Sequence, residues 1–390
     1  MIINSDLRDW DASMNSSSFS VDYMANKITD RPWKKGIYAK QGWGNSLHKI
    51  APYVGRIKPA FAHWLIKICT KKDETLLDPF CGIGTVVLEA DLLGRDCIGV
   101  DLNPYAAIIS KAKFYRKPIQ DYIHFINSIN FDSDVNLDNI PRFIKEYYHE
   151  KTLKELINLR DACLKKNNYF ILGCLLGIAH GHRDIHLSMR TGYIIPYIPK
   201  PKPKIVYKNV KQRIIKKIKL MCKTNIPIQT KGKIYCADAK KLPIGNNSID
   251  AIISSPPYYD TLDYVKSNYL RLALLKVNLD NQKNLESKLI KKPINYLSEM
   301  KEVGLELNRV LKPNGRIVFV LGDVHKGNKT INTAAEIEKI YTKIGFQSHG
   351  HINDEIPSEK TTIVKFGGEE AIKKKRTKLD RILIMTKNSL

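Results

Sequence analysis

The segment SSPPYYDTLDY, residues 254–264, combines hydrogen-bond acceptors, a rigid backbone and aromatic rings. An exocyclic amino nitrogen on a nucleic acid base is a weak nucleophile, because its lone pair is delocalised into the ring. Acceptors placed against both N–H bonds would localise that lone pair, and the Ser255 oxygen and the Pro256 carbonyl suit this role. Pro256 and Pro257 fix the turn and remove N–H donors, while Tyr258 offers a face for stacking an extruded base. The segment suits activation of a base amino group, although these residues alone would also fit a surface turn.

A second segment, DPFCGIGT at 78–85, lies between an apolar run and a helical pattern. Gly82 and Gly84 allow the backbone to bend sharply and to approach a ligand without a Cβ clash. The N–H groups that begin the following helix can then face an electronegative ligand atom. Asp101 ends the next apolar run, where a carboxylate can accept hydrogen bonds from two ribose hydroxyls. The string is neither GxGxxG nor a P-loop, and together these features predict a nucleotide-type cofactor site.

The stretch LLDPFCGIGTVVLEADLLGRDCIGVDLNPYA, residues 76–106, resembles the S-adenosylmethionine-binding motif of amino-group methyltransferases. The resemblance implies that Asp78, Gly82, Gly84 and Thr85 hold the methionine part of the cofactor, and that Asp101 binds its ribose. Upstream, HKIAPYVGRIKP at 48–59 resembles the segment that packs on the methionine end in cytosine-N4 DNA methyltransferases, with Tyr53 and Arg56 as the best-matched positions. Asp238 matches the acid that contacts the cofactor adenine. The remaining positions that we assign to the cofactor site on this resemblance are Pro79, Phe80, Leu102 and Ala239.

SPPY at 255–258 resembles the serine form of the catalytic motif of cytosine-N4 DNA methyltransferases. The implied activity is methyl transfer from S-adenosylmethionine to the N4 amine of a flipped cytosine in double-stranded DNA, in a restriction–modification or related defence system. A cognate restriction endonuclease is a candidate partner. Adenine-N6 enzymes more often carry Asp at the first position, but a neutral Ser also accepts a hydrogen bond, so adenine-N6 methylation stays open. An RNA exocyclic-amine methyltransferase and a non-catalytic DNA-binding subunit stay open as well.

The elements that must position these residues follow a β-α-β-α pattern with apolar, non-alternating strands, which is typical of a parallel sheet covered on both faces. We expect strands at 75–80, 96–102, 233–238, 249–255, 316–324 and 381–387, and helices at 59–70, 86–94, 103–115, 143–166, 170–181, 300–311 and 334–345. The resemblance implies a Rossmann-like class I methyltransferase fold, with a mostly parallel twisted sheet, helices on both faces and a largely helical basic insertion.

Four regions are expected along the chain. They are a polar N-terminal segment without firm structure (1–45), a cofactor-binding half (46–117), an insertion that interrupts the sheet between its second and third strands (118–230), and a catalytic half (231–390). We interpret the insertion as the region that recognises the DNA target.

The chain has 390 residues and a formal net charge of +25, which favours a polyanionic partner such as nucleic acid. Residues 185–237 contain no Asp or Glu, and KNVKQRIIKKIKLMC at 208–222 predicts a basic amphipathic helix. We therefore expect the basic stretch to hold the DNA backbone beside the methyltransferase site. A solvated Lys-rich face is the alternative. The predicted DNA-binding residues are Arg190, Lys200, Lys202, Lys204, Lys211, Arg213, Lys216, Lys217 and Lys219.

Seven scattered cysteines without a CxxC pair predict reduced thiols in a cytoplasm, and we expect no metal site. The histidines of HGHRDIH at 180–186 lack a compact set of further ligands, so we interpret that segment as a loop near DNA. No run of 18 apolar residues occurs, and MIINSDLRDW has no basic region followed by an apolar stretch. We therefore expect neither a membrane span nor a secretory signal.

Overall fold

The computed structural model describes residues 20–138, 140–190, 196–224, 230–257, 264–290, 295–326, 329–355 and 379–389. Tyr258 and the basic cluster at 373–378 therefore lie outside the described residues. The strands are β1 (Thr75–Asp78), β2 (Asp96–Asp101), β3 (Gly232–Cys236), β4 (Ile249–Ser254), β5 (Leu311–Gly322), β8 (Phe346–Glu355) and β9 (Leu379–Lys387), with a separate ribbon of β6 (Val324–Lys326) and β7 (Lys329–Ile331).

The helices are α2 (Val21–Thr29), α3 (Pro59–Cys69), α4 (Thr85–Leu92), α5 (Pro104–Phe114), α6 (Ile119–Asn127), α7 (Arg142–Lys145), α8 (Glu150–Lys165), α9 (Tyr169–Ala179), α10 (Val210–Met221), α11 (Tyr269–Leu274), α12 (Leu279–Lys288), α13 (Tyr296–Val310) and α14 (Thr333–Thr342). Short 3-10 turns are η2 (Pro32–Lys34), η3 (Gly36–Ala39), η4 (Ser46–Lys49) and η5 (Lys266–Asn268). The sequence analysis did not predict the helices α2, α6, α11 and α12, the strand β8 or the ribbon of β6 and β7.

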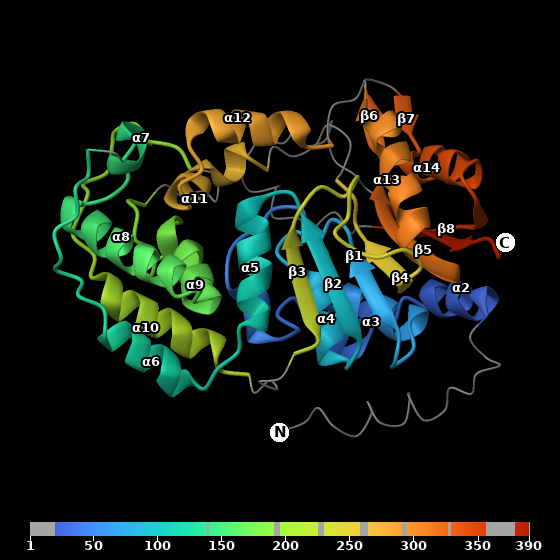
Figure 1. Cartoon of the computed structure of the whole chain (residues 1–390), viewed down its shortest axis with the longest axis horizontal. Helices are drawn as coiled ribbons and strands as arrows, with labels where there is room; N and C mark the ends of the chain where they lie inside the picture. Colours follow the sequence, from blue (N-terminus) through green and yellow to red (C-terminus); the bar gives the residue numbers. More distant parts are fainter. Residues whose placement is uncertain are drawn as a thin grey trace.

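The seven-stranded sheet has the order β3-β2-β1-β4-β5-β9-β8 (Figure 1). Neighbouring strands from β3 to β5 are parallel, and β9 pairs antiparallel with both β5 and β8. The carboxyl ends of β1, β2, β3 and β4 therefore meet at one edge. This arrangement confirms the predicted mostly parallel Rossmann-like fold, in which ligands bind outside the carboxyl ends of the strands.

The sheet is covered on both faces, because alternate side chains of its strands enter different cores. In β5, Ile317 and Phe319 pack with α13 and α14, whereas Val318 and Val320 pack with α3 and α4. Residues 312–315, between the expected helix at 300–311 and the expected strand at 316–324, lie within β5. The pairing of β5 with β4 shifts register there: Ile249 opposes Leu311, and Ala251 opposes Arg316.

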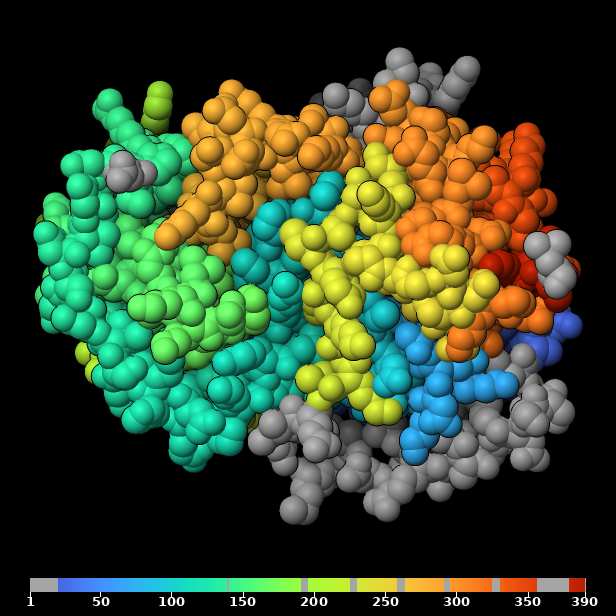
Figure 2. Space-filling view, viewed as in Figure 1, coloured from blue at the N-terminus to red at the C-terminus, as the bar shows by residue number. Residues whose placement is uncertain are grey.

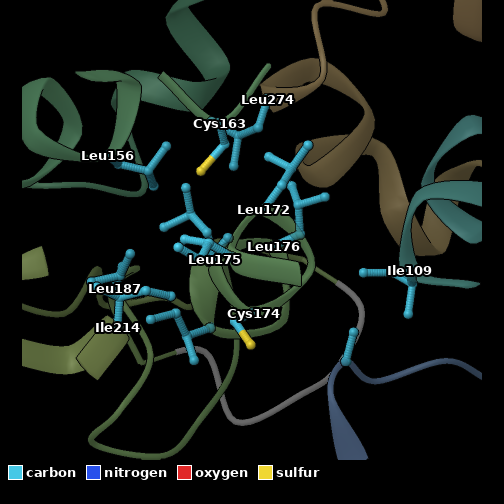
Figure 3. Packing of buried hydrophobic residues seen from close by; sticks show 14 of the residues in the cluster. Ile109, Leu156, Cys163, Leu172, Cys174, Leu175, Leu176, Leu187, Ile214 and Leu274 are labelled. Carbon is cyan, nitrogen blue, oxygen red and sulfur yellow. The ribbon is translucent and has the colours of Figure 1, made fainter. Parts of the chain in front are cut away.

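The insertion between β2 and β3 forms a helical layer of α6 to α10, as the sequence predicted. Its core surrounds α9, whose side chains are buried all round the helix. Figure 3 shows Leu172, Leu175 and Leu176 of α9 among residues from neighbouring helices, including Ile109 of α5 and Ile214 of α10. α11 joins the same core although it follows β4 in the chain. The insertion is thus continuous with the rest of the fold rather than a separately packed lobe.

The expectation of no firm structure in 1–45 is wrong for residues 20–45. Ser20 accepts a hydrogen bond from Tyr23 N and caps α2, which buries Met24 and Ile28 one turn apart. Trp33 is buried against Phe61 of α3, and its Nε1 donates to Asp354 Oδ2 at 3.3 Å. These few apolar residues order the segment because α3 and β8 supply the surfaces that they cover.

Candidate functional site

A cavity that is partly open to solvent lies at the carboxyl ends of the parallel strands. Eleven of the twelve predicted cofactor residues line the cavity: Tyr53, Arg56, Asp78, Pro79, Phe80, Gly82, Thr85, Asp101, Leu102, Asp238 and Ala239. The twelfth, Gly84, shapes the turn below. The predicted catalytic residues Ser255 and Pro257 line the same cavity.

The glycine turn adopts a backbone that only glycine accepts readily. Gly82 and Gly84 have φ values of 51° and 72°, and Gly84 is the N-cap of α4. A Cβ at Gly84 would lie 2.6 Å from Ser110 Oγ, so a side chain there would collide with α5. Beneath the turn, buried Lys113 donates from Nζ to Gly84 O at 3.2 Å, and burial lowers its pKa to about 7. The turn is therefore held in place by a lysine that the sequence motifs did not reveal.

Asp101 is oriented by its own backbone surroundings at the end of β2. Its Oδ2 accepts from Gly82 N and its Oδ1 from Asn103 N, both at 2.8 Å. Burial raises its pKa to about 6, although these two hydrogen bonds favour the ionised form. Each oxygen keeps a further lone pair, so the carboxylate can still accept from ligand hydroxyls, as expected for a ribose-binding acid.

Asp78 links the cofactor strand to the catalytic strand. Its Oδ1 accepts from Ser254 Oγ at 2.6 Å and from Phe80 N at 3.2 Å. Burial raises its pKa to about 7, and the hydrogen bond from Ser254 is the largest opposing effect. Sequence reasoning missed Ser254, which sits next to the motif residue Ser255 but faces β1 instead of the cavity.

Arg56 is fixed from behind by a buried network. Its Nη1 donates to His48 O, and His48 Nε2 pairs with Glu89 Oε1 of α4 at 2.6 Å. His63 Nδ1 holds the other oxygen of Glu89 at 2.9 Å. Burial alone would raise the pKa of Glu89, but its hydrogen bonds with the two histidines lower it to about 2. The network places one cation in the cavity wall.

Two buried polar atoms in the cavity wall have no hydrogen-bond partner among the described residues. They are Thr85 Oγ1, at the start of α4, and Asn103 Nδ2, at the start of α5. Buried polar atoms are usually paired, so these two indicate a ligand with both donors and acceptors. Together with the Asp101 carboxylate and the Arg56 cation, they fit S-adenosylmethionine, which carries ribose hydroxyls, an amino group and a carboxylate.

In the predicted catalytic motif, Ser255 can act as a hydrogen-bond acceptor. Its hydroxyl donates to Val320 O of β5 at 3.2 Å, so its proton is already used and the oxygen lone pairs face elsewhere. Pro256 is buried and Pro257 is half-buried at the cavity wall. The stacking role of Tyr258 remains a prediction. Sequence reasoning missed a further wall segment, Lys288 to Ile290, since only the packing of α12 brings it to the cavity.

The predicted basic helix is α10, and it buries the expected apolar residues Val210, Ile214, Ile218 and Met221. Lys216 and Lys219 are exposed on its outer face beside Lys223. Lys217 does not fit the predicted DNA-binding role, because it is buried and donates from Nζ to Lys49 O at 2.7 Å. α10 thus offers a narrower cationic face than the sequence suggested.

The other predicted DNA-binding residues lie on the same helical layer. Arg190 pairs with the Asp184 carboxylate, and Arg213 donates from Nε to Asp184 O at 3.2 Å. Those that are exposed are Arg190, Lys200, Lys202, Lys204, Lys216 and Lys219, with Lys211 and Arg213 half-exposed.

α10 lies at the level of the amino ends of the parallel strands (Figure 1), whereas the cavity lies at their carboxyl ends. The chain leaving it reaches Lys231, whose backbone N–H donates to Asp91 near the end of α4 at 2.8 Å, just before β3 begins. Figure 1 shows α10 at the level of the amino ends of β2 and β3. The expectation that the basic stretch lies beside the catalytic segment is therefore not met by α10.

The seven cysteines are free thiols, and Cys81 is a buried packing residue in the glycine turn. Among the described residues, no cluster of three or more His, Cys, Asp or Glu has a metal-binding arrangement. His180 is buried and pairs with Ser188 Oγ at 3.0 Å, so it belongs to the core of the helical layer. Within the described ranges, no helix has the length and apolar character needed to cross a membrane.

Residues 18–112 match the N6_N4_Mtase family model, described as DNA methylase. The Type II methyltransferase M.MjaII of Methanocaldococcus jannaschii is 28% identical over 126 residues, which cover 32% of this chain and 22% of that protein. M.BsoBI of Geobacillus stearothermophilus, also a Type II methyltransferase, is 24% identical over 287 residues, covering 60% of this chain and 53% of its own length. The chain thus spans about a fifth and about half of these two curated relatives.

A tRNA (guanine(10)-N2)-dimethyltransferase of M. jannaschii is 23% identical over 130 residues, covering 30% of this chain and 37% of that protein. Among solved structures, an S-adenosylmethionine-dependent methyltransferase from Methanosarcina mazei is 12% identical, with 82% of this chain and 95% of that chain covered at a TM-score of 0.36.

Proposed function

We propose that this chain is an S-adenosylmethionine-dependent DNA methyltransferase that methylates the N4 amine of a cytosine extruded from the duplex. The observation that carries the proposal is the position of Ser255, which lines the same cavity as Asp101 and the glycine turn. The match of residues 18–112 to a DNA methylase model supports a DNA substrate. The two Type II methyltransferase relatives support a place in restriction–modification, with a cognate endonuclease as a partner.

In this mechanism, the cofactor supplies an electrophilic methyl group at a sulfonium centre. Asp101 would hold the ribose, and Thr85 and Arg56 would hold the methionine end. Ser255 Oγ and Pro256 O would accept hydrogen bonds from the two N–H groups of the target amine, which would localise the nitrogen lone pair and make the nitrogen a better nucleophile. Positioning and preorganised acceptors supply most of the rate enhancement.

The exposed cations of the helical layer would contact DNA phosphates. Lys217 is left out of this group because it is buried. We further propose that the protein works in the cytoplasm, since five of its seven cysteines are buried thiols that suit a reducing compartment.

Replacement of Ser255 by alanine tests the catalytic assignment. We expect Ser255→Ala to lower methyl transfer to plasmid DNA by about 100-fold, because one acceptor of the amine is removed. Cofactor affinity measured by calorimetry should stay within about twofold. Ser298→Ala, at an exposed serine in the first turn of α13, is the matched control. Wild-type transfer rates in Ser255→Ala would contradict the proposal.

The modified base needs its own measurement, because a neutral serine can accept from either amine. Methylation-aware sequencing of DNA from cells expressing the chain should find N4-methylcytosine at a fixed site. N6-methyladenine would support adenine as the target instead. Labelled-methyl transfer to total RNA but not to plasmid DNA would favour an RNA substrate, to which the tRNA dimethyltransferase relative points.

A further inference from the structure

Arg271 is a completely buried arginine in α11, between the helical layer and the cofactor cavity. A buried guanidinium costs several kcal/mol of desolvation unless its donors are paired. The partners of its donors therefore show what the residue holds together. None of the motifs in the sequence includes Arg271.

On one side, Arg271 binds the carboxyl end of α9. Its Nε donates to Leu176 O at 3.3 Å and its Nη2 to His180 O at 3.0 Å. The last carbonyls of a helix lack partners within the helix and carry partial negative charge. The guanidinium thus anchors α11 to the end of the most buried helix of the insertion.

On the other side, Arg271 reaches the cavity through Asn268 and Tyr264. Its Nη1 donates to Asn268 Oδ1 at 3.4 Å, and Asn268 Nδ2 donates to Tyr264 O at 3.0 Å. The Tyr264 ring stacks on Tyr53, with 5.6 Å between centroids and 21° between planes. Both tyrosines line the cavity, and Tyr53 lies directly over Gly82, where a Cβ would meet its ring at 3.3 Å.

A third interaction connects Arg271 to Tyr53 by a second route, through Tyr105. The Arg271 guanidinium lies over the Tyr105 ring at 5.6 Å, and Tyr105 Oη donates to Pro52 O at 3.0 Å. The Tyr105 and Tyr53 rings are 6.3 Å apart. Arg271 therefore holds both members of the stacked pair, Tyr264 through Asn268 and Tyr53 through Tyr105.

We propose that Arg271 is a positioning residue. It fixes the position of the Tyr53–Tyr264 wall of the cofactor cavity relative to the helical insertion. The inference rests on the proposed function for the identity of the cofactor. Arginine suits this position because its planar fork donates in several directions at once and stays charged when buried, whereas lysine offers one nitrogen. Figure 2 shows the gold segment that contains α11 and α12 between the green helical layer and the orange segment that contains α13.

The test compares Arg271→Met, Arg271→Lys and Asn268→Ala with the wild-type chain. Arg160→Met is the matched control, because Arg160 is also a buried arginine of the helical layer but pairs with Asp161. Each variant is assayed below its Tm for S-adenosylmethionine affinity by calorimetry and for kcat and KM with DNA. Asn268→Ala breaks the same connection without removing a buried charge, so it carries the test if Arg271→Met does not fold.

We expect Arg271→Met to weaken cofactor binding by about tenfold and to lower kcat more than it changes KM for DNA. Arg271→Lys should recover part of the affinity, Asn268→Ala should show a smaller loss, and Arg160→Met should lower Tm without changing cofactor affinity. Folded Arg271→Met or Asn268→Ala with wild-type affinity and kcat would overturn the inference, and so would an equal loss in Arg160→Met.

A wild-type chain that binds the cofactor but methylates no DNA would reject only the proposed function, since the affinities still test the role of Arg271. A wild-type chain without cofactor affinity would reject both.

Discussion

Asp101 and Asp78 are two carboxylates of one cavity wall whose protonation depends on their burial. Burial raises the pKa of Asp101 to about 6 and that of Asp78 to about 7, while backbone and Ser254 hydrogen bonds favour the charged forms. A cationic sulfonium ligand and ribose hydroxyls both prefer ionised carboxylates. Ligand binding should therefore lower both pKa values and release protons.

This predicts that cofactor affinity falls as the pH is lowered from about 8 to about 5, since the free protein then protonates groups that the ligand needs ionised. Asp101→Asn should weaken binding at neutral pH and remove the part of the pH dependence centred near 6. Asp96→Asn, at the exposed opposite end of β2, is the control. Calorimetry across this range checks the prediction, and an unchanged pH profile in Asp101→Asn would contradict it.

At the scale of elements, α9 is the helix around which the insertion folds. It is apolar on all sides, and it contacts α5, α8, α10 and α11. The sequence predicted an apolar helix there, but it did not show that α11, which follows β4 in the chain, would complete the surroundings of α9. The helical layer and α11 therefore share one core.

Leu175→Ala should lower the free energy of unfolding by about 2–5 kcal/mol, because it leaves a cavity in this core. Leu175 is 1% exposed, whereas Leu305 on α13 is 52% exposed and provides the control. Leu305→Ala should change the free energy by less than about 0.5 kcal/mol. Urea unfolding of both variants measures the difference, and equal small effects would show that α9 is not part of a tightly packed core.

At the scale of the whole molecule, the net charge of +25 is shared between structural and surface roles. Arg271, Lys113 and Lys217 are buried and donate to backbone carbonyls. Lys216 and Lys219 are exposed on α10, toward the edge of the sheet away from the cavity. DNA held there would have to extend beyond the flipped base, across the helical layer.

Replacing Lys216 and Lys219 together by alanine should reduce the salt dependence of DNA binding by roughly one unit of log-log slope for each phosphate interaction that the substitutions remove. Cofactor affinity should stay the same. The control double variant, Lys301→Ala with Lys343→Ala, removes the same amount of charge. Lys301 is exposed on α13, and Lys343 is exposed at the C-cap of α14. Equal slopes in the two double variants would mean that the lysines of α10 form only a solvated face.

The sequence by itself predicted six of the seven strands of the sheet, and eleven of the twelve residues that it predicted for the cofactor line one cavity. This was possible because the glycine turn, Asp101 and Asp238 sit at the ends of apolar strands, and parallel strands bring their carboxyl ends to one edge. Only the tertiary structure decided that Ser254 holds Asp78, that Lys217 is buried, that residues 20–45 fold against α3, and that Arg271 joins the insertion to the cavity wall. These depend on contacts between residues distant in the chain, which local periodicity does not contain, since burial and pairing are set only when separate elements pack together.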